Sequence, residues 1–87
     1  MNKRKLSLGN RNISGKRVTE ARERKKMSQV ELLVKMQVMG VEISVPALSL
    51  LEGQKRPVND IELKAISKIL GVSIDWLADN EEEGELQ

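Results

Sequence analysis

The sequence contains no cysteine and no histidine, and Trp76 is its only aromatic residue. These absences remove disulfides, thiolate nucleophiles, imidazole bases and the usual zinc ligand sets. No apolar stretch reaches the roughly 20 residues that a membrane span needs, and the initial Met-Asn-Lys-Arg-Lys is not followed by the apolar segment of a secretory signal. We therefore expect a cytoplasmic protein that uses no metal or cofactor. An enzyme would have to work with carboxylates, Lys and hydroxyls only, and because no carboxylate pair has a nearby Gly-rich loop or metal set, we expect that the protein is not an enzyme.

The apolar residues that are present favour helices. Without Phe and Tyr, the core must consist of Leu, Ile, Val, Met and Ala, which suit small packed helices better than a sandwich of strands rich in aromatic residues. A chain of 87 residues fits one domain of marginal stability. We therefore expect an all-α fold.

The charged residues are distributed unevenly, although the net charge is only +2. Residues 1–17 carry basic and no acidic side chains, whereas residues 74–87 carry acidic and no basic ones. We interpret residues 1–13 as a basic N-terminal arm and residues 80–87 as an acidic C-terminal tail. The basic arm can be attracted to the phosphates of DNA, and DNA contact and simple solvation are equal alternatives for it. We expect the acidic tail to be solvated.

Helical spacing and capping residues divide residues 14–79 into one domain with five helices. The first is expected over residues 14–26, with one narrow apolar stripe. Ser28 stands three residues before Glu31, which is the capping-box spacing that opens a second helix. Gly40 marks the point where the apolar pattern of this second helix ends.

The connection to the third helix predicts an expanded turn. Residues 37–43 are longer than the tight turn that is usual in a helix-turn-helix. The third helix begins at Ser44 or Val45, because Pro46 is tolerated only in the first turn and Ser44 is a natural cap. Residues 55–57, Lys-Arg-Pro, then form a basic loop.

A fourth helix is capped by Asn59 or Asp60 and ends at Gly71 in the left-handed conformation. Ser73 caps a short fifth helix that returns to the core. The apolar face of the fourth helix is expected to contain Ile61, Leu63, Ile66, Ile69 and Leu70.

The order of these residues resembles the Cro/C1-type (XRE-like) family of helix-turn-helix transcriptional regulators. The resemblance spans residues 15–78 and lies in the joint spacing rather than in any single residue. Gly53 follows Glu52 directly and Gln54 stands where the family usually has Gly, which leaves the course of the basic loop open. The residues that occupy the family's frame are Arg22, Ser28, Gln29, Leu48, Ser49, Leu51, Glu52, Arg56, Leu70, Gly71, Val72 and Ser73.

The resemblance implies a five-helix, lambda-repressor-like DNA-binding bundle. Such a domain binds double-stranded DNA as a homodimer on a two-fold symmetric operator, with the third helix in the major groove. We favour a repressor, with activation by direct contact through the acidic tail as the alternative. We expect neither a membrane nor a small-molecule ligand as partner. The resemblance also implies a structural ion pair between Arg22 and Glu52. The expected DNA-binding residues are Ser28, Gln29, Ser44, Val45, Pro46, Ala47, Ser49, Leu50, Lys55 and Arg56.

Other interpretations of these residues stay open. Ser28 can act only as a cap, Gln29 can be merely exposed, and the loop at Lys55 and Arg56 can be solvated. The expected base-facing residues include no Arg, Gln or Asn to recognise purine edges, so we expect few direct hydrogen bonds to bases. Val45, Pro46 and Ala47 can contact thymine methyl groups, Ser49 can bond to a base or a phosphate, and DNA shape can supply the remaining specificity. An exposed Leu50 is harder to explain on DNA. It can instead pack against a neighbouring element, including the expanded turn at residues 39–43, or against a protein partner.

The alternative function is therefore a protein-protein interaction module, antitoxin-like or an accessory factor, built on the same fold. For the homodimer we expect the fifth helix, around Ile74, Trp76 and Leu77, to form the contact, unless the dimer forms only on DNA. Trp76 as an ordinary core residue is the favoured alternative to an interface role.

Overall fold

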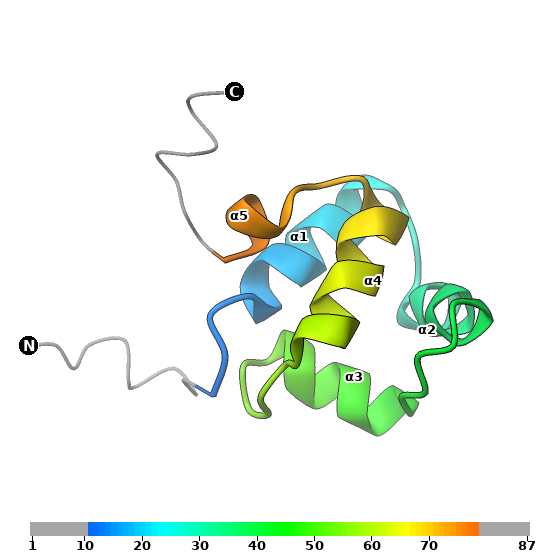
Figure 1. The fold of residues 1–87 in the computed structure, drawn as a ribbon, viewed down its shortest axis with the longest axis horizontal. Helices are drawn as coiled ribbons and strands as arrows, with labels where there is room; N and C mark the ends of the chain where they lie inside the picture. Colours follow the sequence, from blue (N-terminus) through cyan, green and yellow to red (C-terminus); the bar gives the residue numbers. More distant parts are fainter. Residues whose placement is uncertain (1–10, 79–87) are drawn as a thin grey trace, which may run out of the picture.

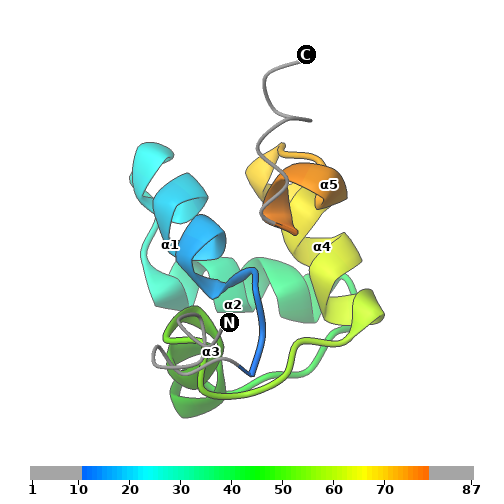
Figure 2. The same ribbon diagram turned by 90° about the vertical axis from the view of Figure 1, so that its left-hand side faces the viewer.

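The computed structural model describes residues 11–78, which form five α-helices and no strand. The all-α fold class is confirmed, and the helices pack as a compact bundle (Figures 1 and 2). No helix in this part of the chain has the length and apolar character needed to cross a membrane. Most of the expected basic arm and the whole acidic tail lie outside the described residues. The helices are α1 (Gly15–Arg24), α2 (Gln29–Val38), α3 (Val45–Glu52), α4 (Asp60–Leu70) and α5 (Ile74–Leu77).

Side chains at the helix N-termini determine where four of the helices begin. Each cap accepts a hydrogen bond from a backbone N–H in the first turn of its helix. The caps of α2 and α4 belong to capping boxes, in which a glutamate also accepts from the backbone N–H of the cap residue. All four starts agree with the sequence prediction. The capping residues are Ser28, Ser44, Asn59 and Ser73.

The start of α1 is capped differently, by a residue that we had assigned to the basic arm. Oδ1 of buried Asn12 accepts from the backbone N–H groups of Ser14, at 2.9 Å, and Gly15, at 2.7 Å. Its Nδ2 donates to the carbonyl oxygens of Leu51, at 3.0 Å, and Arg56, at 2.7 Å. Asn12 therefore belongs to the folded domain, whose start we had expected at residue 14.

The turn between α2 and α3 is expanded, as predicted. It spans residues 39–44, and Gly40 adopts a left-handed conformation with φ +86°. Val41 and Ile43 are buried, so this segment contributes to the core instead of only linking two helices. The two helices flanking the turn cross at a large angle, since α2 is seen nearly end-on in Figure 1 and lengthwise in Figure 2.

The core is aliphatic, as the composition requires, but one predicted member is wrong. Ile61 is 66% exposed, because Glu62 takes the inward position in the first turn of α4. Glu62 is buried there as the capping-box partner of Asn59. The inward stripe of α4 therefore starts one residue later than expected. The buried apolar residues are Val18, Ala21, Leu32, Leu33, Met36, Val41, Ile43, Leu48, Leu51, Ala65, Ile66, Leu70 and Leu77.

The fifth helix packs inward, against α1 and α4. Leu77 is fully buried within the domain, so the expectation that it forms a dimer surface is wrong. Trp76 is half-buried against the core, and its ring lies under the guanidinium groups of Arg17, at 4.5 Å, and Arg24, at 5.4 Å. Only Ile74 of the three expected interface residues remains substantially exposed.

Candidate nucleic-acid interface

The ion pair between Arg22 of α1 and Glu52 of α3 is present, as the resemblance implied. Nε donates to Oε2 at 2.8 Å and Nη2 donates to Oε1 at 3.0 Å, which makes a two-point contact. The Arg22 and Glu52 side chains are only 12% and 6% exposed. The hydrogen bond to the Glu52 carboxylate raises the pKa of Arg22 above its ordinary value. Arg22 therefore stays charged and fixes the end of α3 against α1.

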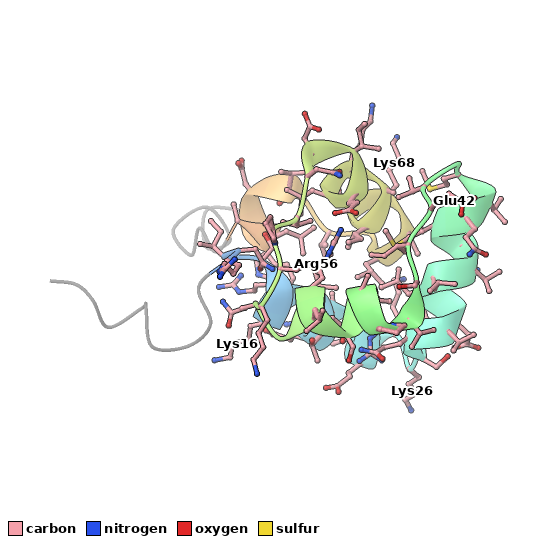
Figure 3. All side chains as sticks on the ribbon, turned by 90° about the horizontal axis from the view of Figure 1, so that it is seen from below. Lys16, Lys26, Glu42, Arg56 and Lys68 are labelled. Atoms are coloured by element: carbon pink, nitrogen blue, oxygen red, sulfur yellow. The ribbon has the colours of Figure 1, made fainter. Side chains whose placement is uncertain are left out.

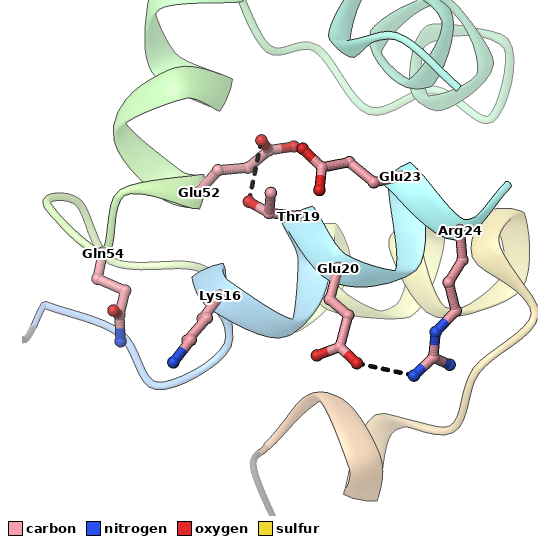
Figure 4. A pocket seen from close by; sticks show the side chains of 7 residues that line it. All are labelled: Lys16, Thr19, Glu20, Glu23, Arg24, Glu52 and Gln54. Atoms are coloured by element: carbon pink, nitrogen blue, oxygen red, sulfur yellow. Dashed lines mark hydrogen bonds and ion pairs between the residues drawn. The ribbon is translucent and has the colours of Figure 1, made fainter. Parts of the chain in front are cut away.

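Glu52 also binds two further side chains, which the sequence did not predict. Its Oε1 accepts from Oγ1 of Thr19 at 3.1 Å and from Nε2 of Gln29 at 3.0 Å. Figure 4 shows the Thr19–Glu52 contact in the shallow groove between α1 and the end of α3. Since Gln29 is the first residue of α2, one carboxylate joins three helices. The amide of Gln29 is thus already bonded inside the protein, and its contact with phosphate stays a prediction.

The N-terminus of α2 is exposed at Ser28. The Ser28 hydroxyl accepts from the N–H of Glu31 at 3.0 Å, and Oε1 of Glu31 accepts from the N–H of Ser28 at 2.7 Å. The capping role of Ser28 is therefore confirmed, while its contact with phosphate stays a prediction. Lys26 precedes this cap in a left-handed turn, with φ +57°, and its side chain is exposed.

The outer side of α3 carries most of the residues that we expected to face DNA. Pro46 and Ser49 are exposed, and Leu50 is 47% exposed with no helix of the described chain covering it. Figure 3 views this side of the molecule, with α3 in front and Lys16 and Lys26 pointing outward near its two ends. Three other expected residues lie at the start of α3. Val45 is 41% exposed, and Ala47 is half-buried against the core. The Ser44 hydroxyl caps the helix.

The two basic side chains of the loop after α3, Lys55 and Arg56, lie in different environments. The guanidinium of Arg56 makes a two-point ion pair with buried Glu62, with both N···O distances 3.2 Å. The Lys55 side chain is exposed, and its backbone N–H donates to the carbonyl of Leu50 at 2.8 Å. The structure thus presents Lys55 to solvent and holds Arg56 mainly against α4.

The course of this loop depends on Gln54, which adopts a positive φ. Gln54 has φ +64°, a left-handed conformation that Gly adopts more readily. Its carbonyl accepts from the N–H of Arg11 at 3.0 Å, and its Nε2 donates to the carbonyl of Asn12 at 3.1 Å. These bonds offset the backbone strain and attach residues 11 and 12 to the end of α3.

Sequence reasoning also missed Gly15. A Cβ at this position would overlap the carbonyl oxygens of Leu51 and Glu52, so only Gly lets the start of α1 approach the end of α3 this closely. A small residue at the start of a helix was the only signal in the sequence, and it did not reveal which element lies opposite.

No group of side chains that could hold a metal ion accompanies these contacts in the part of the chain that the structure describes. Residues 11–78 contain no cluster of acidic side chains that could hold a metal ion. In the groove of Figure 4, Glu20 pairs with Arg24 at 2.7 Å and Glu52 accepts from Thr19, so these carboxylates already have partners.

No protein-family model, curated protein or solved structure matches this chain. The resemblance to Cro/C1-type regulators therefore rests on the residues and their spacing alone. The geometry of the candidate interface consists of α3, which Glu52 anchors on its inner side and which is open on its outer side.

Proposed function

We propose that this chain is a sequence-specific, DNA-binding transcriptional regulator of the Cro/C1-type (XRE-like) helix-turn-helix class. It acts in the cytoplasm as a repressor, with a lambda-repressor-like arrangement in which α3 enters the major groove. Two copies bind a two-fold symmetric operator, because one small module reads too few base pairs for useful affinity.

The observation that carries this proposal is the contrast between the two sides of α3. On the inner side, Glu52 holds Arg22, Thr19 and Gln29 from α1 and α2. On the outer side, Ser49 and Leu50 are exposed. A helix that inserts into a groove needs this arrangement, since its outer residues reach base edges in register only when its position relative to the phosphate contacts is fixed.

Phosphate contacts come from groups at both ends of this surface. The first turn of α2 offers the positive end of a helix dipole next to Ser28, with Lys26 beside it. At the other end of α3 stand Lys16 and Lys55, both exposed. Their ammonium groups displace counterions from the DNA backbone, so the affinity falls as the salt concentration rises.

Base recognition relies on small and apolar side chains. Val45 and Pro46 contact thymine methyl groups, while the Ser49 hydroxyl bonds to a base edge or a phosphate. Because few direct hydrogen bonds are available, sequence-dependent DNA shape contributes the remaining specificity. Arg56 adds positive charge near the flanking backbone, although Glu62 already holds its guanidinium.

The experiment that tests this function is selection from a randomised duplex library with excess competitor DNA at physiological salt. Enrichment of a two-fold symmetric motif with half-sites about one helical turn apart supports a dimeric, sequence-specific regulator. Retention without enrichment reduces the function to non-specific phosphate binding. Absence of retention overturns the proposal.

The exposed Leu50 supports a second candidate function, a protein-protein interaction module of the antitoxin or accessory type. Leu50 and Val45 are 47% and 41% exposed on a helix that carries no charge on its outer side. Such a surface suits the apolar centre of a protein interface. Failure to bind DNA, together with loss of a protein complex in Leu50→Ser, distinguishes this candidate from the first.

A further inference from the structure

The outward side of α2 carries an apolar stripe that no element of the described chain covers. Val30, Val34 and Val38 recur at every fourth residue, so they lie along one side of the helix. Their exposed fractions are 54%, 48% and 82%. The opposite side of α2 holds its buried residues, Leu32, Leu33 and Met36. We call the three exposed residues the valine stripe. Contiguous exposed apolar residues of this kind mark interaction surfaces.

Opposite charges lie at the two ends of this helix. Lys26 precedes α2 and Glu42 follows it, and Figure 3 shows them toward opposite ends of the helix. Both side chains are exposed, and neither has an ion-pair partner among residues 11–78. They stand the same number of residues before and after Val34. Two antiparallel copies of α2 therefore have unlike charges at each shared end.

We propose that the valine stripe is the contact between two copies of this chain. A two-fold axis passes near Val34, so each Val34 faces the other and Val30 faces Val38 of the second copy. Lys26 of each copy then lies near Glu42 of the other. This contact specifies the homodimer in the proposed function, but it forms without DNA and is testable without it.

The arrangement of the helices is compatible with DNA binding by such a dimer. In Figure 1, α2 lies on the right-hand side of the molecule and α3 lies along the bottom. Figure 2 shows that α2 runs across this vertical direction. A vertical two-fold axis beside α2 therefore makes the two copies of α2 antiparallel and leaves both copies of α3 facing the same side. That is the geometry a symmetric operator requires.

The described chain begins and ends away from this surface. Both ends of the described chain lie on the side of the molecule opposite to α2 (Figure 1). The segment that follows, residues 79–87, has five acidic side chains and a single large apolar one, Leu86. Its chemistry does not match a stripe of three valines. A second copy fits better, because it supplies both the valines and the charges.

The test is sedimentation equilibrium of the full chain without DNA. The wild-type chain is expected to show a monomer–dimer equilibrium. Val34→Lys places two like charges face to face and weakens self-association by at least about tenfold. Ile61→Lys is the matched control, because it changes another exposed apolar residue, on α4, and leaves the equilibrium unchanged. Circular dichroism verifies the helix content of each variant, and Val38→Lys, at the most exposed position of the stripe, repeats the test.

Charge reversal tests the orientation of the two copies. Lys26→Glu and Glu42→Lys each place like charges opposite one another and weaken the dimer by about threefold. The double variant restores the attraction and the wild-type equilibrium. The proposal is overturned if the wild-type chain stays monomeric at concentrations up to about 1 mM. It is also overturned if the Val34→Lys variant dimerises as strongly as the wild-type chain. Failure of the double variant to restore the dimer overturns the antiparallel arrangement. A chain that dimerises in this way but retains no DNA refutes only the proposed function.

Discussion

Arg22 and Glu52 hold each other through two parallel hydrogen bonds, 2.8 Å and 3.0 Å long, in a site that leaves the carboxylate almost fully buried. Each charge depends on the other, because a buried ion without its partner loses hydration and gains nothing in return. With the Glu52 carboxylate charged, the raised pKa of Arg22 means that this contribution is fully present below the ordinary arginine pKa. On the alkaline side, it is lost as the pH rises through the raised value.

Removing one partner tests this dependence. Glu52→Ala leaves the Arg22 guanidinium uncompensated and frees Thr19 and Gln29, so we expect the free energy of unfolding to fall by about 3 kcal/mol. Urea denaturation monitored by circular dichroism measures the change. Glu20→Ala is the matched control, because it breaks the exposed pair with Arg24 and costs less than about 1 kcal/mol. Equal stability of the two variants contradicts a structural role for the Arg22–Glu52 pair.

The close approach of α1 and α3 predicts that Gly15 tolerates no side chain. Gly15→Ala forces a Cβ against the carbonyl oxygens of Leu51 and Glu52, so we expect a loss of about 1–3 kcal/mol in the free energy of unfolding. Gly53→Ala serves as control, since a Cβ there makes only ordinary contact, at 3.4 Å from the Ser49 carbonyl oxygen. Denaturation midpoints of the two variants check the prediction. A stable Gly15→Ala variant means that α1 and α3 lie further apart.

The four hydrogen bonds of Asn12 predict that the start of the domain depends on this one side chain. Asn12→Ala removes the cap of α1 and two donated hydrogen bonds, one to the Leu51 carbonyl in α3 and one to the Arg56 carbonyl in the following loop. We expect a loss of about 2 kcal/mol in the free energy of unfolding. Ile13→Ala truncates an exposed neighbour and is expected to change stability by less than about 0.5 kcal/mol. Thermal unfolding of both variants decides whether Asn12 is part of the fold or of a solvated arm.

The two cations of the basic loop are expected to respond differently to truncation. Lys55→Ala weakens binding to all DNA sequences and reduces the salt slope by about one, without affecting stability. Arg56→Ala leaves the buried Glu62 carboxylate unpaired, so it lowers the melting temperature first. Fluorescence anisotropy across a salt series and thermal unfolding separate the two effects. If Arg56→Ala changes only the salt slope, its ion pair with Glu62 is unimportant for stability.

Ser49 tests whether the outer side of α3 contacts bases. Ser49→Ala removes the one hydroxyl on this side outside the cap, and we expect altered preference at particular operator positions with little change in non-specific affinity. Repeating the library selection with this variant measures the change. An unchanged motif implies that another surface reads the sequence.

Several features of the fold depend only on residues that are close together in the sequence, so they could be predicted from it. Ser28 with Glu31, Ser44 before Pro46, and Ser73 each act within one helical turn, so their spacing alone determines where helices begin. Gly71 ends α4 in the left-handed conformation for the same local reason. The absence of Phe and Tyr likewise required an aliphatic core.

Contacts between residues that lie far apart in the sequence could be found only in the tertiary structure. The residues next to Asn12 in the sequence do not predict its hydrogen bond to Leu51. Those next to Gly15 do not predict that carbonyl oxygens of α3 leave no space for a Cβ there. The partner of Glu52 was found only through the spacing of a known motif, and the hydrogen bond that the same carboxylate accepts from the Gln29 amide was not predicted. Hydrogen bonds and close packing of this kind depend on how whole helices meet.

The candidate interface is divided in the same way between sequence and structure. Sequence periodicity located α3 and its outward residues, because helical spacing determines which side chains share a side. It did not separate exposed Lys55 from paired Arg56, and it placed the dimer contact at α5, where Leu77 is buried. Whether a charged or apolar side chain meets solvent or a partner depends on what the rest of the chain packs against it, and only the assembled bundle specifies that.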